Sequence, residues 1–131
     1  MAMNSVLIID DDEVDFIIHS KIIHKENSSV KVTYKSSGIE ALNYLNKIIE
    51  DGEEWPTHIL VDINMPPING FEFVEAYSKY PEKVTQKAKI YILSSSDSSD
   101  DKSKAREYPL ITDYIVKPLS IEIARKIFSQ S

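Results

Sequence analysis

The chain has 131 residues, of which 42% are hydrophobic and 27% are charged, so its composition indicates neither a disordered nor a fibrous protein. This length fits one domain (residues 1–131, with a core over about 4–129), and we expect no output domain. The 21 acidic residues outnumber the 15 basic ones, and the net charge of -6 argues against a nucleic-acid partner.

The chain lacks cysteine and lacks the apolar segments of secreted or membrane-spanning proteins. The chain contains no cysteine, which excludes disulfides, thiolate metal sites and thiol nucleophiles. The N-terminus lacks the basic and apolar segments of a secretion signal, and no apolar run approaches the roughly 20 residues needed to cross a bilayer. We therefore expect a cytoplasmic protein that is not bound to a membrane.

Five short apolar runs of strand length alternate with longer segments of helical period. The runs cover residues 6–10, 30–34, 58–63, 89–95 and 113–117. The helical segments include 38–51, 69–80, 98–108 and 120–130, and a first one in which Val14, Ile17, Ile18 and Ile22 form a mostly apolar stripe. Strands so rich in Val, Ile and Leu are buried on both faces, so the pattern predicts an α/β fold with a parallel sheet and helices on both faces.

The chemically informative residues lie where the apolar runs stop, because ligands of such sheets bind beyond the carboxyl ends of the strands. Asp10 and Asp11 end the first run, Tyr34 ends the second, Asp62 lies at the end of the third, Ser94 near the end of the fourth, and Lys117 at the end of the fifth. Neighbouring carboxylates repel one another unless a cation, a helix terminus or water meets them. The strand ends therefore predict a charged site.

Together with "DINMPPING" after the third run and "KP" after the fifth, these residues resemble the receiver domain of response regulators from about Val6 to Phe128. The resemblance implies a stand-alone, chemotaxis-regulator-like receiver with the flavodoxin-like strand order 2-1-3-4-5. It also implies a two-component phosphorelay in which a phosphohistidine donates a phosphoryl group to the protein. The roles that it implies are Asp62 as phosphoacceptor, Asp10, Asp11, Asp62 and the backbone carbonyl of Asn64 as Mg²⁺ ligands, and Ser94 and Lys117 as holders of the phosphoryl group.

The resemblance also implies a switch and partners. Tyr114 would turn inward when Ser94 moves toward the phosphoryl group, although an ordinary strand aromatic is an equally good interpretation. The bond before Pro118 is a candidate cis peptide. A sensor histidine kinase or histidine phosphotransfer protein would phosphorylate the chain, and a downstream protein would bind the fourth helix, fifth strand and last helix. The chain would be no enzyme beyond assisting its own phosphorylation and dephosphorylation.

Elementary chemistry supports these roles. Mg²⁺ is a hard ion that takes one or two carboxylates and phosphate oxygens and keeps several waters. A carboxylate attacks an anionic phosphoryl donor poorly, and a cation together with the compact charge of Lys117 lowers that repulsion.

Other interpretations remain open. Asp12 and Glu13 fit a helix cap and first turn better than a metal site. His19 and His24 are expected on the surface. A haloacid-dehalogenase-like phosphatase would also use an aspartate nucleophile and Mg²⁺, but Asn64 replaces the second acid of its motif. A flavodoxin-like FMN carrier would need a phosphate loop where this chain has "DDDE". The segment "EYPLITDY" departs from the family pattern before the fifth strand.

Overall fold

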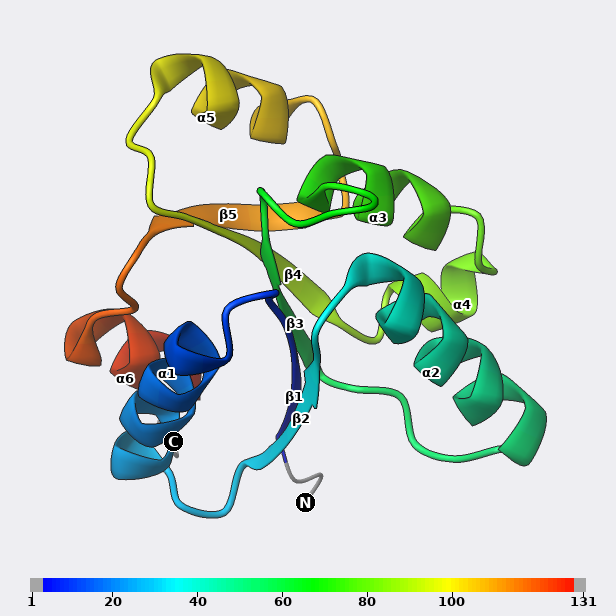
Figure 1. The fold of residues 1–131 in the computed structure, drawn as a ribbon. Helices are drawn as coiled ribbons and strands as arrows, with labels where there is room; N and C mark the ends of the chain where they lie inside the picture. Colours follow the sequence, from blue (N-terminus) through cyan, green and yellow to red (C-terminus); the bar gives the residue numbers. More distant parts are fainter. Residues whose placement is uncertain (1–3, 129–131) are drawn as a thin grey trace.

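The computed structural model describes residues 4–128, in which five parallel strands form a sheet with the order β2-β1-β3-β4-β5 (Figure 1). The strands are β1 (Ser5–Ile9), β2 (Lys31–Lys35), β3 (His58–Asp62), β4 (Lys89–Ser94) and β5 (Ile111–Val116). All four neighbouring pairs run parallel. The predicted α/β class and strand order are confirmed, and the expected core boundary at residue 129 lies just outside the described residues.

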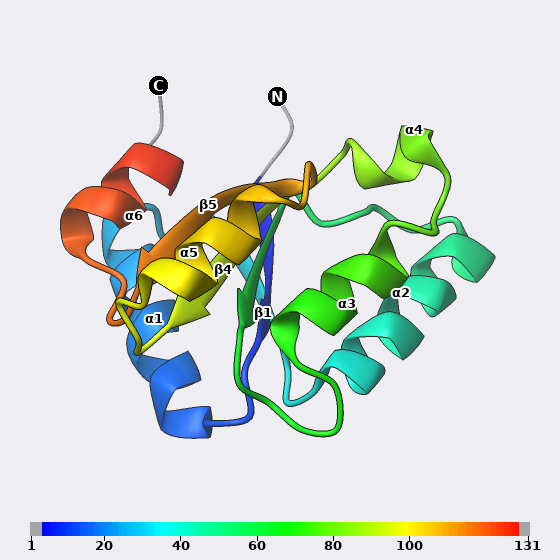
Figure 2. The same ribbon diagram turned by 90° about the horizontal axis from the view of Figure 1, so that it is seen from above.

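The helices cover both faces of this sheet (Figures 1 and 2). They are α1 (Glu13–Glu26), α2 (Gly38–Asp51), α3 (Gly70–Tyr77), α4 (Glu82–Thr85), α5 (Ser99–Arg106) and α6 (Ile121–Phe128). Helices α1 and α6 lie together on one face, and α2, α3 and α5 lie on the other. The single-turn helix α4, which begins after Pro81, has no apolar period and was not predicted. Among residues 4–128, none of the helices combines the length and apolar character that crossing a bilayer requires.

The core has one layer on each side of the sheet, because successive strand residues point to opposite faces. Leu7, Ile9 and Val61 pack toward α2 and α3, whereas Ile8 and Leu60 pack toward α1 and α6. All five are fully buried, and each such side chain stabilises the fold by roughly 1.5–3 kcal/mol. The near-continuous apolar character of the strands therefore follows from burial on both faces.

The apolar stripe noted for the first helix is not its buried face. Val14, Ile17 and Ile18 are 63%, 42% and 42% exposed, whereas the buried residues of α1 are His19 and Ile23. Apolar residues lie on several sides of this helix, so their spacing does not define one face. The expectation that His19 lies on the surface is also wrong, while His24 is exposed as expected.

Gly70 allows the backbone to approach the end of β3 closely. Asn69 and Glu72 form a reciprocal capping box at the start of α3, and the N–H of Gly70 donates to the carbonyl of Ile63 at 3.0 Å. A Cβ atom at Gly70 would lie 2.7 Å from the carbonyl oxygen of Asp62 and 3.1 Å from Cα of Ile63. Helix α3 thus packs against the backbone that carries Asp62.

Gly70→Ala is expected to lower the free energy of unfolding by about 1–3 kcal/mol, because the added methyl group meets rigid backbone. Gly38→Ala is the matched control, since Gly38 also begins a helix but its added Cβ would meet side-chain atoms rather than backbone, with Cδ1 and Cγ1 of Ile68 at 2.7 and 2.8 Å and Cε of Met65 at 3.6 Å. Urea denaturation of both variants measures the difference. Equal losses of stability would show that the close approach at Gly70 does not constrain the fold.

Candidate functional site

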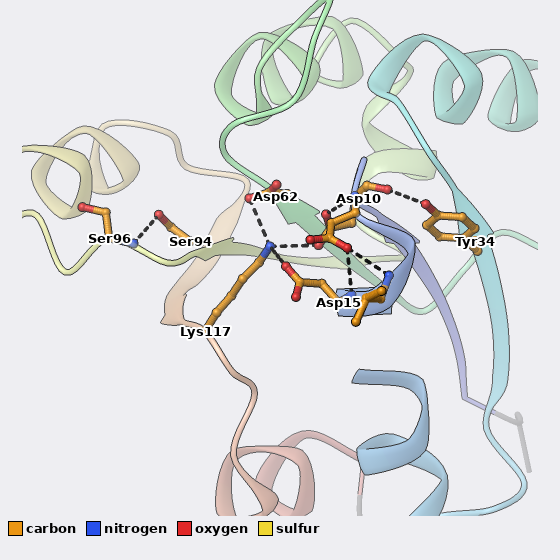
Figure 3. A network of polar contacts seen from close by, with 9 residues as sticks. Asp10, Asp15, Tyr34, Asp62, Ser94, Ser96 and Lys117 are labelled. Carbon is orange, nitrogen blue, oxygen red and sulfur yellow. Dashed lines mark hydrogen bonds and ion pairs between the residues drawn. The ribbon is translucent and has the colours of Figure 1, made fainter. Parts of the chain in front are cut away.

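The carboxyl ends of four strands bring the predicted site residues to one edge of the sheet (Figure 3). Asp10 follows β1, Asp62 ends β3, Ser94 ends β4 and Lys117 follows β5. The side chains of Asp10, Asp62 and Lys117 point toward one another in Figure 3. The edge joins residues more than 100 positions apart in the chain, since Lys117 contacts Asp10.

Three carboxylates lie close enough to share one cation. Asp10, Asp11 and Asp62 each offer an oxygen, and these oxygens all lie within 4.8 Å of one another. Asp10 and Asp62 are buried and Asp11 is exposed, so the cluster opens to water on one side. Such an all-oxygen set with access for water fits Mg²⁺. The backbone N–H of Asn64 donates to Asp62, and the role of the Asn64 carbonyl as a ligand stays a prediction.

Lys117 supplies the positive charge of this edge. Its Nζ atom lies 2.9 Å from Asp10, 2.9 Å from Asp15 and 3.5 Å from Asp62. Burial alone would lower the pKa of Lys117, but hydrogen bonds to Asp15 and Asp10 and the charge of Asp62 outweigh burial and raise it. The ammonium group therefore stays charged at any physiological pH.

Asp62 is a buried carboxylate whose pKa is raised. Burial raises its pKa, Lys117 lowers it, and the charge of Asp10 raises it again, with a net value of about 6. Its side chain is 9% exposed, so water screens these charges weakly. Without a metal, the carboxylate is ionised at neutral pH at a cost in stability.

The remaining residues of the acidic run have a structural role. Asp12 is the N-cap of α1, and its Oδ1 accepts hydrogen bonds from the N–H groups of Val14 and Asp15 at 2.9 and 3.3 Å. Glu13 is the first residue of the helix, where a negative charge meets the positive end of the helix dipole. The expected division of the run into a site pair and a capping pair agrees with this geometry.

Hydrogen bonds link Ser94 to Tyr114. The N–H of Ser96 donates to Oγ of Ser94 at 3.0 Å, and the hydroxyl of Tyr114 donates to the carbonyl of Ser96 at 2.7 Å. The N–H and the carbonyl of Ser96, in the loop after β4, are thus both held, one by a site residue and one by β5. The bond between Lys117 and Pro118 is cis.

Two residues near the site make contacts that the sequence does not predict. Asp15 binds Lys117, and the hydroxyl of Tyr34 donates to the backbone carbonyl of Asp10 at 2.8 Å. Tyr34 also stacks on Phe16 of α1, with ring centroids 4.2 Å apart. Asp11 precedes the N-cap of α1, so helical spacing from the acidic pair could not have placed Asp15 at the site. Tyr34 ends a strand run, but an aromatic residue there carries no specific chemical signal.

His19 and His58 are both buried. Burial, with a contribution from Lys117, lowers the pKa of His19. Burial also lowers the pKa of His58 to about 4, and His58 packs against the ring of Phe128. Both are therefore neutral at physiological pH and belong to the core.

Comparisons with known proteins agree with this arrangement. Residues 6–128 match the family model of the response regulator receiver domain. A two-component response regulator from Cytophaga hutchinsonii is 32% identical, with a TM-score of 0.88 over 98% of this chain and 96% of that chain. A response regulator receiver protein from Dyadobacter fermentans is 31% identical, with a TM-score of 0.83 over 96% of this chain and 94% of that chain.

The chain is also similar to one segment of a much longer protein. The sensor histidine kinase CheAY of Helicobacter pylori is 28% identical over 126 residues, which are 96% of this chain. This match spans only 15% of the kinase. The similarity is therefore to one part of that protein.

Asp62→Asn is expected to raise the free energy of unfolding in EDTA. Asp62 has a pKa of about 6 in the folded protein against an ordinary value of 3.8, so the folded state binds this proton more tightly. The stability that this carboxyl contributes is present below pH 3.8 and is lost as the pH rises through about 6. The advantage of the variant should therefore grow over that range and level off on the order of 3 kcal/mol.

Denaturant unfolding at a series of pH values measures this difference. Glu50→Gln is the control, because Glu50 is an exposed carboxylate on α2, far from the site. Its difference from the wild type should stay flat over the same range. An equally flat difference for Asp62→Asn would show that Asp62 is not strained by its burial.

Proposed function

Because the chain belongs to the response regulator receiver family of two-component systems, we propose that it is switched by transfer of a phosphoryl group to Asp62. A phosphohistidine on a sensor histidine kinase or histidine phosphotransfer protein would be the donor. The observation that carries the proposal is the convergence of three carboxylates and Lys117 at one edge of the sheet. The kinase relative from Helicobacter pylori supports a histidine kinase as the partner. Family membership decides against the phosphatase and the FMN carrier.

The proposed step is a displacement at phosphorus. An Oδ atom of Asp62 attacks the phosphoryl group, the P–N bond to the histidine breaks, and the imidazole keeps the bonding electron pair. Both reactants are anionic, so the nearby ammonium of Lys117 lowers their repulsion. Ser94 can donate its hydroxyl hydrogen to a phosphoryl oxygen, because its Oγ serves only as acceptor in the bond from Ser96.

The donor set described above fits Mg²⁺ as the cofactor. Asp10, Asp11, Asp62 and the carbonyl of Asn64 would hold the ion, which would neutralise charge on the phosphoryl oxygens. Asp10 and Asp62 are placed by neighbouring strands, and the N–H of Asp12 fixes Asp10 by donating to its Oδ1 at 2.9 Å. The chain would assist only its own phosphorylation by the donor and its own hydrolysis by water.

The output of the switch would leave through the face formed by α5, β5 and α6. Movement of Ser94 would pull on Ser96, which holds the hydroxyl of Tyr114. Tyr114 also lines a surface hollow of about 390 Å³ between α5 and β5. A change in Tyr114 would alter the shape that this hollow presents to a downstream protein.

The acceptor assignment is tested with acetyl phosphate and Mg²⁺. The wild type should gain the mass of one phosphoryl group, and hydroxylamine should remove it, as it does from acyl phosphates. Asp62→Asn should gain none, since the amide is no nucleophile. Asp100→Asn, which changes an exposed aspartate on α5, should behave as wild type. A variant at Asp62 that is phosphorylated at the wild-type rate would contradict the assignment.

The output route is tested with beryllofluoride, a phosphoryl mimic, and Mg²⁺. Amide NMR signals of residues 98–108 and 114–128 should shift in the wild type and much less in Ser94→Ala, which lacks the hydroxyl. Ser95→Ala is the matched control, because Ser95 is exposed and follows β4, and it should respond as wild type does. If the mimic binds and these signals stay unchanged, output leaves through another surface.

A further inference from the structure

Lys117 has one acidic partner more than the proposed phosphoryl chemistry requires. Its ammonium group has three N–H donors, and it has carboxylate neighbours at Asp10, Asp15 and Asp62. Asp15 is as close as Asp10, at 2.9 Å, and closer than Asp62, at 3.5 Å. The motif that identifies the family does not include Asp15.

Asp15 differs from the other two partners because it lies outside the candidate metal cluster. Asp10 and Asp62 belong to the group of oxygens within 4.8 Å of one another, and Asp15 does not. It lies in the first turn of α1, where the helix dipole favours a negative charge. Its N–H donates to the capping oxygen of Asp12, so the cap fixes its backbone.

We propose that Asp15 is a positioning residue that keeps Lys117 at the site when Asp10 binds a divalent cation. Asp10 then shares its charge between that cation and the ammonium, and Asp15 is the partner that Lys117 retains. The retained pair holds the flexible side chain of Lys117 within reach of Asp62 and prevents it from turning into water. This role rests on the proposed function, because Lys117 would act on a phosphoryl group at Asp62.

The burial of Lys117 strengthens its ion pair with Asp15. Ion pairs between fully exposed side chains contribute little, because water screens them and both side chains lose conformational freedom. The side chain of Lys117 is only 13% exposed, and that of Asp15 is 33% exposed. The pair is therefore partly shielded from water, and Lys117 cannot leave Asp15 without being solvated or bound elsewhere.

The role predicts a coupling between Asp15 and Lys117 in Mg²⁺ binding. In Asp15→Asn, Lys117 depends on Asp10 alone for a short ion pair and competes more strongly with the metal. The dissociation constant for Mg²⁺ should therefore rise about threefold or more. In a Lys117→Gln background the same change should raise it less than about twofold, because only a distant charge is lost.

The measurement is an amide NMR titration of the unphosphorylated protein with MgCl₂, with thermal melts to show that each variant is folded. Glu13→Gln removes an exposed charge of α1 that no contact links to Lys117, and it should have the small effect. Asp15→Glu should restore much of the affinity. A crystal structure with Mg²⁺ should show Lys117 still hydrogen-bonded to Asp15.

The positioning role would be overturned if Asp15→Asn raised the dissociation constant for Mg²⁺ equally in the wild-type and Lys117→Gln backgrounds. It would also be overturned if Lys117 left Asp15 in the Mg²⁺ complex, or if the wild type did not bind Mg²⁺. The titration involves no phosphoryl transfer. If the coupling is present and acetyl phosphate fails to modify Asp62, the proposed function fails while the positioning role stands.

Discussion

The ammonium group of Lys117 lies among carboxylates at one edge of the sheet, and its positive charge offsets their mutual repulsion. Asp10 is fully buried and Asp62 nearly so, and two buried like charges are costly unless an opposite charge meets them. Lys117 is delivered there by the end of β5, where its N–H donates to the carbonyl of Ser94 at 2.7 Å. The pairing of β5 with β4 therefore decides whether the acidic cluster is tolerated.

Helix α1 is oriented by the same site. The Asp12 cap fixes its start, Asp15 reaches Lys117, and Phe16 stacks on Tyr34. These contacts select one face of the helix for the site and the sheet. Ile17 and Ile18 are consequently left partly exposed, although burying them would have been favourable. Ile22 and Ile23 pack on the same core cluster as Phe16, so the site contacts and the apolar packing agree on one orientation of the helix.

The sequence predicts the strands, their order by resemblance, and the residues at the strand ends, because apolar runs and charged stops are local signals. It does not predict which side of α1 is buried, since several sides are apolar and the contact of Asp15 with Lys117 joins residues 102 positions apart. It also misses that His19 is buried, because its burial follows from that orientation. The close approach of Gly70 to Asp62 depends on tertiary packing, which no local pattern encodes.

The loop after β4 gives the site a physical connection to a distant surface. Ser94 is buried at the edge of the cluster, whereas Tyr114 is half-buried beside the hollow between α5 and β5. Ser96 binds both, one through its N–H and the other through its carbonyl. A single peptide segment therefore links Ser94 to β5. Because β5 also leads to Lys117, two residues near the end of this strand are tied to the site, Tyr114 through hydrogen bonds and Lys117 through the ion pair with Asp62.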